Sequence, residues 1–328
     1  MNDDAGKTGS LPFTPARPVQ ASLQEDTLSS DEIAYVRNTE TAGRFSNWIM
    51  PMGLFLATTF TTLWAGAYAT NTHPMQGPWQ FLLNDPTVLW KGVPFAGTLL
   101  GILVTHEFGH YLLSRIHRVP ASLPLFIPGP PHFIGTFGAI IRMRGPILGR
   151  KALFDIGVAG PLAGFIVALV ALVIGLQLSK VVETENTYGL HLGEPLLLQF
   201  VAWMVKGSVP VGSDIVLHPV AFAAWFGLFV TSLNLIPIGQ LDGGHVAYAL
   251  WGRKQRTVAL AFLPVLMVLG FVGWPGWFLW AGMAGVLGLA HPPVLDPETV
   301  LGKTRVWIGW ATLAIFVLTF APIPFSIH

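Results

Sequence analysis

Long apolar stretches separated by short polar segments make up nearly all of the chain after residue 47. Crossing a bilayer as a helix takes about 20 predominantly apolar residues. The stretches that approach or reach this length are residues 48–69, 93–113, 154–178, 219–236, 258–272, 276–290 and 306–321. The pattern predicts an α-helical polytopic membrane protein with about seven transmembrane helices.

The segment before the first apolar stretch has a different character. Residues 1–46 are mostly polar, contain several prolines and show no long helical periodicity, although residues 29–37 could form a short amphipathic helix. No basic start leads directly into an apolar run, so the segment does not resemble a secretory signal peptide. We therefore expect a flexible cytoplasmic tail over residues 1–46 and one membrane-embedded body over residues 47–328.

Composition and charge support this interpretation. Hydrophobic residues make up 52% of the chain and charged residues only 11%, and the net charge of +1 gives no reason to expect a nucleic-acid partner. Basic residues favour the cytoplasmic side of a membrane. With seven spans and a cytosolic N-terminus, 15 of the 18 basic residues fall in inner segments, and only Lys91, Lys180 and Lys206 fall in outer loops. The expected location is a bacterial cytoplasmic membrane.

One apolar segment does not fit a transmembrane helix. Residues 120–147 are interrupted by prolines and glycines but include the strand-like sequence FIGTFGAIIRMR. Backbone at membrane depth must be hydrogen-bonded within the protein or line a wet cavity. The segment predicts a small membrane-associated β-hairpin or sheet beside the helices, with an ordinary interfacial loop as the alternative.

The clearest chemical signal is the sequence HEFGH within the second apolar stretch. Residues i and i+4 lie on one face of a helix, so His106 and His110 can bind one metal ion. Glu107 can reach a water on that metal without binding the metal itself. A carboxylate inside a membrane costs about 2.5 to 3.5 kcal/mol on insertion scales and is seldom kept without a function. The alternative is a polar trio that hydrogen-bonds neighbouring helices.

A catalytic zinc usually has three protein ligands and one open position, and a chain without cysteine must supply them from His, Asp or Glu. Asp242 is the candidate for the third ligand, because it lies just beyond the inner end of the fourth span and is the only acidic residue between Asp214 and Asp296. Its alternative role is to cap the following helix. One zinc ion per chain is the expected cofactor.

These motifs together resemble a known family. HEFGH followed by NLIPIGQLDGG is similar to the HExxH and NxxPxxxxDG elements of the site-2 protease family of intramembrane zinc metalloproteases. The likeness extends to GVAGPLAGF at residues 157–165 and to GTFGAII, and covers roughly residues 93–250. The branch without a PDZ domain looks closest, because residues 179–219 are too few to contain one.

The resemblance implies a zinc endopeptidase that cleaves transmembrane segments of other proteins in the bilayer. Its ligands would be His106, His110 and Asp242, and Glu107 would act as the base. Asn234 matches the family's asparagine and would donate a hydrogen bond to the substrate carbonyl, or else join helices by hydrogen bonding. An unwound substrate would bind by strand addition at residues 134–143.

Several neighbouring residues have simpler interpretations. Gly160 and Gly164 are expected to let helices approach closely. His245 is expected on a helix surface, although it could orient a ligand, and no other histidine has a partner spacing. Two other functions remain open: an intramembrane metal or proton transporter, although no inverted repeat is evident, and a catalytically inactive relative.

Overall fold

The computed structural model describes residues 30–70, 78–143, 147, 149–183, 190–292, 294 and 296–327. The protein is mostly helical, with small sheets. The chain divides into two compact units, residues 1–50 and residues 51–328. Helix α1 (Ser30–Ala69) begins inside the segment predicted as a flexible tail, so the part of that segment from Ser30 onward is helical. The earlier part of the predicted tail lies outside the described residues.

The middle of every predicted apolar stretch lies within a helix of the structure. These helices are α1, α3 (Val93–Ile116), α4 (Arg150–Leu178), α6 (Pro219–Asn234), α8 (Gln255–Val272), α9 (Gly276–Leu287) and α10 (Lys303–Thr319). Within the described residues, four helical segments are long and apolar enough to cross a membrane: Trp48–Ala69, Pro86–Ile116, Arg150–Leu178 and Asp242–Val272. The chain thus has four candidate membrane-spanning helices, and helix length does not establish the predicted number of seven.

Several shorter helices were not predicted. They are α2 (Pro78–Asn84), the 3-10 helix η2 (Pro86–Gly92), α5 (Leu196–Lys206) and the 3-10 helix η3 (Gly252–Lys254), whereas α7 (Asp242–Trp251) is the helix expected to follow Asp242. Local chemistry explains η2, because the Asp85 side chain accepts a hydrogen bond from the Thr87 N–H at 2.9 Å and Pro86 occupies the first helical position. These short helices lie in segments that hydropathy alone assigned to loops.

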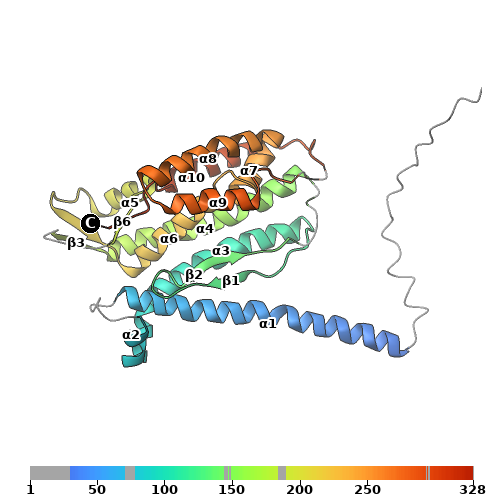
Figure 1. The fold of residues 1–328 in the computed structure, drawn as a ribbon, viewed down its shortest axis with the longest axis horizontal. Helices are drawn as coiled ribbons and strands as arrows, with labels where there is room; N and C mark the ends of the chain where they lie inside the picture. The colour runs from blue at the N-terminus through green and yellow to red at the C-terminus, as the bar shows by residue number, and fades with distance from the viewer. Residues whose placement is uncertain are drawn as a thin grey trace, which may run out of the picture. The chain divides into compact units, whose positions relative to one another are not determined.

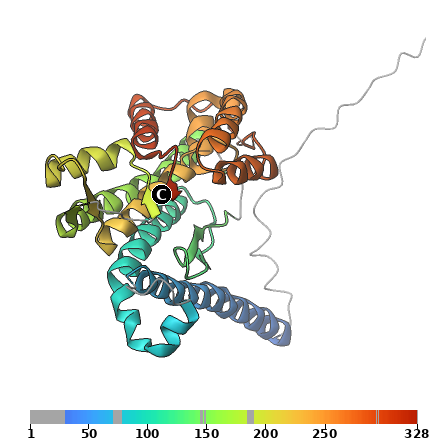
Figure 2. The ribbon, with the colours of Figure 1, turned by 60° about the vertical axis from the view of Figure 1, so that its left-hand side comes forward.

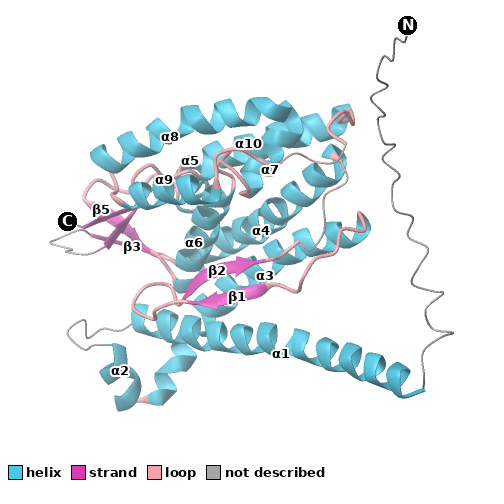
Figure 3. Cartoon of the chain, turned by 45° about the vertical axis from the view of Figure 1, so that its right-hand side comes forward, coloured by secondary structure: helices cyan, strands magenta, loops and turns pink. Residues whose placement is uncertain are grey.

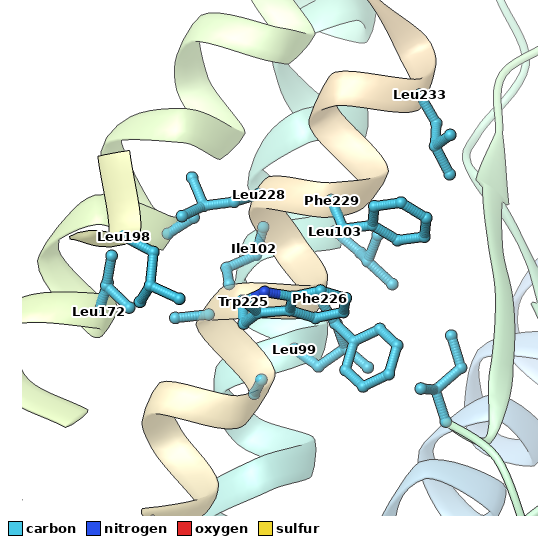
Figure 4. Packing of buried hydrophobic residues seen from close by; sticks show 14 of the residues in the cluster. Leu99, Ile102, Leu103, Leu172, Leu198, Trp225, Phe226, Leu228, Phe229 and Leu233 are labelled. Atoms are coloured by element: carbon cyan, nitrogen blue, oxygen red, sulfur yellow. The ribbon is translucent and has the colours of Figure 1, made fainter. Parts of the chain in front are cut away.

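The core of the larger unit lies where α3, α4 and α6 pack side by side. Figure 4 shows the aromatic side chains of α6 meeting aliphatic side chains of the neighbouring helices. The labelled residues are Leu99, Ile102, Leu103, Leu172, Leu198, Trp225, Phe226, Leu228, Phe229 and Leu233. Trp225 is 1% exposed, and its indole N–H donates to the Gly193 carbonyl at 2.8 Å. Its burial therefore leaves no unpaired polar group.

Three pairs of antiparallel strands accompany the helices. Strand β1 (Leu125–Pro128) pairs with β2 (Thr136–Ile140), β3 (Lys180–Glu183) pairs with β5 (Ser213–Val216), and β4 (Leu190–Leu192) pairs with β6 (Phe325–Ile327). The first pair confirms the predicted hairpin within residues 120–147. The other two pairs lie in segments that were expected to be loops.

The larger unit has the hairpin and α8–α10 on opposite sides of α4 and α6 (Figures 1 and 2). The hairpin contacts α3 and the C-terminal part of α1. The Thr61 hydroxyl donates to the Gly135 carbonyl at 2.6 Å, and the Phe55 and Phe126 rings meet edge to face. The pair β3–β5 lies away from the hairpin, beyond the end of α4 (Figure 3). The sheets therefore occupy different places around one helical core.

Candidate metal centre

Helix α3 presents two histidines on its buried face. His106 and His110 are 4% and 8% exposed, and they continue the stripe of buried residues that includes Leu99 and Leu103. Exposed apolar side chains such as Phe108 lie on the other side of the helix. The helical repeat therefore directs both imidazoles toward the core, as the spacing predicts.

Asp242 reaches these histidines from a different helix. It is the first residue of α7, and the loop before it connects directly to the end of α6. A β-carbon on Gly243 would lie only 2.0 Å from the Leu235 carbonyl oxygen, so the glycine allows α7 to begin tightly against this loop. The arrangement brings the carboxylate into the space between α3 and α4.

The three side chains form a nearly equilateral triangle of ligand atoms. His106 Nε2 lies 3.2 Å from His110 Nε2, and each of these nitrogens lies 3.3 Å from Asp242 Oδ2. Zinc binds nitrogen and oxygen ligands at about 2.0 to 2.2 Å, so tetrahedral ligands lie roughly 3.3 to 3.6 Å apart. The residues present therefore fit a zinc ion with three protein ligands.

A hydrogen bond fixes which His110 nitrogen is available to a metal. His110 Nδ1 lies 2.7 Å from the Ile156 carbonyl oxygen on α4. A carbonyl oxygen only accepts hydrogen bonds, so Nδ1 carries the proton and Nε2 is left as the unprotonated ligand atom. This backbone partner is typical of metal-binding histidines.

Two glycines of α4 provide the room for the imidazole rings. A β-carbon on Gly160 would lie 2.1 Å from His110 Nε2, and one on Gly164 would lie 3.1 Å from the His106 β-carbon. The sequence predicted close helix packing here, and the packing partners are the predicted ligands themselves. A larger side chain at either position would therefore push against one of the two histidines predicted to bind the metal.

The other two predicted site residues lie at the same place. Glu107 is 5% exposed on α3 and interacts electrostatically with both His110 and Asp242. Asn234 is the last residue of α6, and its side-chain amide nitrogen lies 3.3 Å from His106 Nε2. The structure thus brings together all five residues that the sequence singled out, although their individual roles stay predictions.

Sequence reasoning missed a histidine pair next to this site. His245 Nδ1 lies 2.7 Å from His291 Nε2, although 46 residues separate the two in the chain and no spacing indicated the pair. Burial lowers the pKa of His291 below its ordinary value. His291 Nδ1 faces the Pro292 carbonyl oxygen at 2.5 Å, so this nitrogen holds the proton and His245 donates to His291 Nε2.

A second missed cluster links the ends of three helices. The Arg305 guanidinium of α10 donates to both carboxylate oxygens of Asp155 on α4, at 2.7 and 2.8 Å. His117, which follows α3, lies 2.9 Å from the same carboxylate. These three residues lie far apart in the chain, so no spacing in the sequence indicates that they meet. Only the fold reveals the cluster.

A membrane-embedded helix bundle that gathers an HExxH motif and a distant aspartate around one point belongs to the class of membrane metalloproteins. Comparison with protein families identifies it more closely: residues 94–272, more than half of the chain, match peptidase family M50. The chain belongs to this family. The resemblance to site-2 proteases is thereby confirmed.

Relatives with curated descriptions point the same way. The chain is 32% identical over 197 residues to probable zinc metalloprotease EGY2, chloroplastic, of Arabidopsis thaliana, covering 58% of this chain and 34% of that protein. It is 29% identical over 246 residues to probable zinc metalloprotease EGY1, chloroplastic, of the same plant, covering 70% and 43%. The matched region spans less than half the length of each of these relatives. They are chloroplastic, so they give no support to the expected bacterial membrane.

Proposed function

We propose that this protein is an intramembrane zinc endopeptidase that cleaves transmembrane segments of other membrane proteins. One zinc ion per chain is held by His106, His110 and Asp242. The observation that carries the proposal is the triangle of ligand atoms with edges of 3.2 to 3.3 Å inside a buried helix bundle. Membership of a peptidase family supports hydrolysis of peptide bonds as the reaction.

Glu107 is the general base in this proposal. Zinc, when bound, supplies Lewis-acid chemistry that polarises a peptide carbonyl and acidifies water at the open position. Glu107 takes the proton of the attacking water and later gives it to the leaving amine. Its position next to His106 in the chain and its burial on the same helix support this role.

Asn234 is proposed to donate a hydrogen bond to the substrate carbonyl as negative charge develops on its oxygen. Its amide nitrogen is 3.3 Å from a proposed ligand atom, His106 Nε2. The asparagine side chain therefore lies next to one of the proposed ligands. If zinc were held at His106 Nε2, that nitrogen could not accept a hydrogen bond from Asn234, and the amide N–H groups would be available to the substrate.

The substrate is proposed to bind as an added strand within residues 134–143. A helical substrate has its carbonyls already hydrogen-bonded, so it must unwind before cleavage. Within the described residues, β2 pairs only with β1, which leaves one edge of β2 available. Phe137 is 70% exposed on this strand, as is typical of a surface that meets lipid or a partner. Substrates with Gly, Pro or Asn near the cut are expected to be preferred.

Seven membrane crossings with a cytosolic N-terminus are proposed for the same chain. Contacts between connecting segments support this arrangement, because segments assigned to one side contact each other. On the inner side, Arg150 donates to the Ala249 carbonyl at 3.0 Å, and Arg305 binds Asp155. On the outer side, the His218 N–H donates to the Ser179 hydroxyl at 2.9 Å, and β4 pairs with β6.

The two alternative functions differ from the peptidase in what the same site would do. A metal or proton transporter would use the same buried His, Glu and Asp side chains to pass an ion, and an inactive relative would keep the metal without hydrolysis. Family membership favours the peptidase, and all the motif residues are intact.

The test compares Glu107→Gln with the unchanged protein, both purified in full and reconstituted with a membrane-protein substrate that carries a single transmembrane segment. Glu107→Gln should retain zinc but lose cleavage by a factor of about 10² to 10⁴, as expected for loss of a general base. Zinc flux into sealed vesicles with no cleavage by the unchanged protein would support the transporter. Normal cleavage by Glu107→Gln would refute the proposed mechanism.

A further inference from the structure

A fully buried glutamine lies close to the candidate metal centre. Gln255, the first residue of α8, is 0% exposed. Its side-chain nitrogen donates to the Pro237 carbonyl at 3.2 Å and to the Leu289 carbonyl at 3.1 Å, and its oxygen accepts from the His291 N–H at 3.1 Å. Burying an amide is costly unless it is paired. Here every partner is a backbone group of one of two loops.

The first of these loops connects α6 to α7 and leads into Asp242. Gln255 binds it at Pro237, and the Gly239 N–H donates to the Leu289 carbonyl at 3.4 Å. Leu289 therefore contacts the loop directly and also through Gln255. The two attachments lie on either side of Ile238, so they restrain the loop just before the proposed ligand.

The second loop also holds the first turn of α7. His291 Nε2 accepts a hydrogen bond from His245 Nδ1 at 2.7 Å, and His245 lies three residues after Asp242. The backbone N–H of His245 donates to the Leu241 carbonyl at 2.9 Å, which closes that turn. The turn that begins with Asp242 is thus held by a side chain from outside the helix.

Helix α4 supports the opposite side of the same turn. A β-carbon on Gly157 would lie 2.8 Å from the β-carbon of His245, so the two helices are in close contact there. Gly157 follows Ile156, whose carbonyl accepts from His110 Nδ1. The first turn of α7 is therefore held between α4 and the loop of His291, at the level of a proposed zinc ligand.

We infer that Gln255, His291 and His245, here called the Gln255 clamp, position the Asp242 carboxylate for metal binding. These are positioning residues, because they act through the backbone around Asp242. The inference rests on the proposed function, since it takes His106, His110 and Asp242 as the metal ligands. Loss of groups that orient metal ligands typically lowers metal affinity by about 10- to 100-fold.

The test measures metal binding by the purified full chain without any substrate. Zinc affinity is obtained by competition with a coloured chelator, and the coordination geometry from the visible spectrum after loading with Co²⁺. Gln255→Leu keeps the size of the side chain but removes its hydrogen bonds, and should weaken zinc binding about tenfold or more and alter the cobalt spectrum. Thr312→Val is the matched control, because its buried hydroxyl bonds only within α10.

His245 provides a second, independent pair of variants. His245→Asn keeps a side-chain N–H near the position of Nδ1 and should preserve most of the zinc affinity, whereas His245→Leu should lose it to the same extent as Gln255→Leu. A purely structural role would lower thermal stability in both leucine variants without changing the cobalt spectrum. If Gln255→Leu does not fold, the two His245 variants decide the question.

The possible failures are distinct. If the unchanged protein binds no zinc, the proposed function fails and the clamp fails with it. If the unchanged protein binds zinc and the leucine variants bind it equally tightly with an unchanged cobalt spectrum, the clamp alone is overturned.

Discussion

Gly160 of α4 faces His110 of α3 so closely that a β-carbon at position 160 would lie 2.1 Å from the His110 Nε2 atom. This nitrogen is also the proposed ligand atom, because Nδ1 of the same ring is engaged with the Ile156 carbonyl. Position 160 must therefore be occupied by glycine if the proposed metal site is to form and α3 and α4 are to pack this closely.

Gly160→Ala should therefore lose bound zinc while the helices remain formed. The added methyl group cannot fit beside the imidazole, so His110 must leave its position or α4 must move away from α3. Zinc content measured by elemental analysis, together with circular dichroism, would test this. Gly101→Ala on α3 is the control, because its β-carbon would meet nothing within 4 Å, and it should keep its zinc. A Gly160→Ala variant with full zinc occupancy would contradict the geometry.

Asp242→Ala should release the zinc ion or bind it much more weakly. The substitution leaves two histidine ligands, and a catalytic zinc ordinarily needs three protein ligands. Elemental analysis of the purified variant is the measurement. Asp214→Ala on β5 removes a carboxylate that accepts a hydrogen bond from the neighbouring Ile215 N–H, and it should retain zinc. Full occupancy in Asp242→Ala would mean that another group supplies the third ligand.

The helical part of the fold was predictable because it depends on local composition. Apolar stretches longer than a few turns must be helical inside a membrane, and all the predicted stretches contain helices. The i, i+4 spacing of His106 and His110 also fixes their common face. Asp242 was chosen because a zinc site needs a third ligand and no other acidic residue lies between Asp214 and Asp296, and Asn234 was chosen from the family resemblance; periodicity indicated neither.

The parts that escaped prediction depend on contacts between distant segments. Strand β4 exists because β6 pairs with it, although more than a hundred residues lie between them in the chain. The Arg305 and Asp155 pair and the His245 and His291 pair also join separate helices or loops. No periodicity within one segment could reveal such partners, so the sequence left His245 either as a helix-surface residue or as a group that orients a ligand.

Asn234→Ala should lower kcat while leaving bound zinc unchanged. Loss of one hydrogen-bond donor to a developing oxyanion typically costs about 10² to 10³ in kcat, and KM should change little. Ser232→Ala on the same helix removes a buried hydroxyl that bonds only within α6, so it serves as the control. Loss of zinc in Asn234→Ala would instead indicate that the asparagine holds His106 in place.

Phe137→Pro should reduce cleavage without reducing zinc content. Proline removes the backbone N–H that an added substrate strand would use. Phe137→Ala is the control, because it keeps the N–H and removes only the exposed ring; it should cleave much better than the proline variant. Gly138→Pro and Ala139→Pro are also expected to reduce cleavage. These two changes would in addition disturb the hairpin itself, because Gly138 has a φ of 95°, which proline cannot adopt, and Ala139 pairs with Phe126 of β1. Normal cleavage by all three proline variants would refute strand addition.

Single cysteines should report the proposed topology, because the natural chain contains none. A cysteine at position 194, replacing an exposed glutamate, should react with a membrane-impermeant thiol reagent only from the non-cytosolic side. A cysteine at position 253, replacing an exposed arginine, should react only from the cytosolic side. Labelling of both positions from the same side of sealed vesicles would refute the seven-span arrangement.

The burial of Glu107 beside Asp242 has a consequence for how the protein is assembled. Two carboxylates carry two formal negative charges, the imidazole ligands are neutral when they bind a metal, and a zinc ion carries two positive charges. The loaded centre is thus electroneutral, and because uncompensated charge in an apolar interior is costly, protons must balance the charge of these side chains when no metal is bound. Assembly of the centre should therefore exchange protons for the zinc ion, so that zinc is taken up less readily as the pH falls.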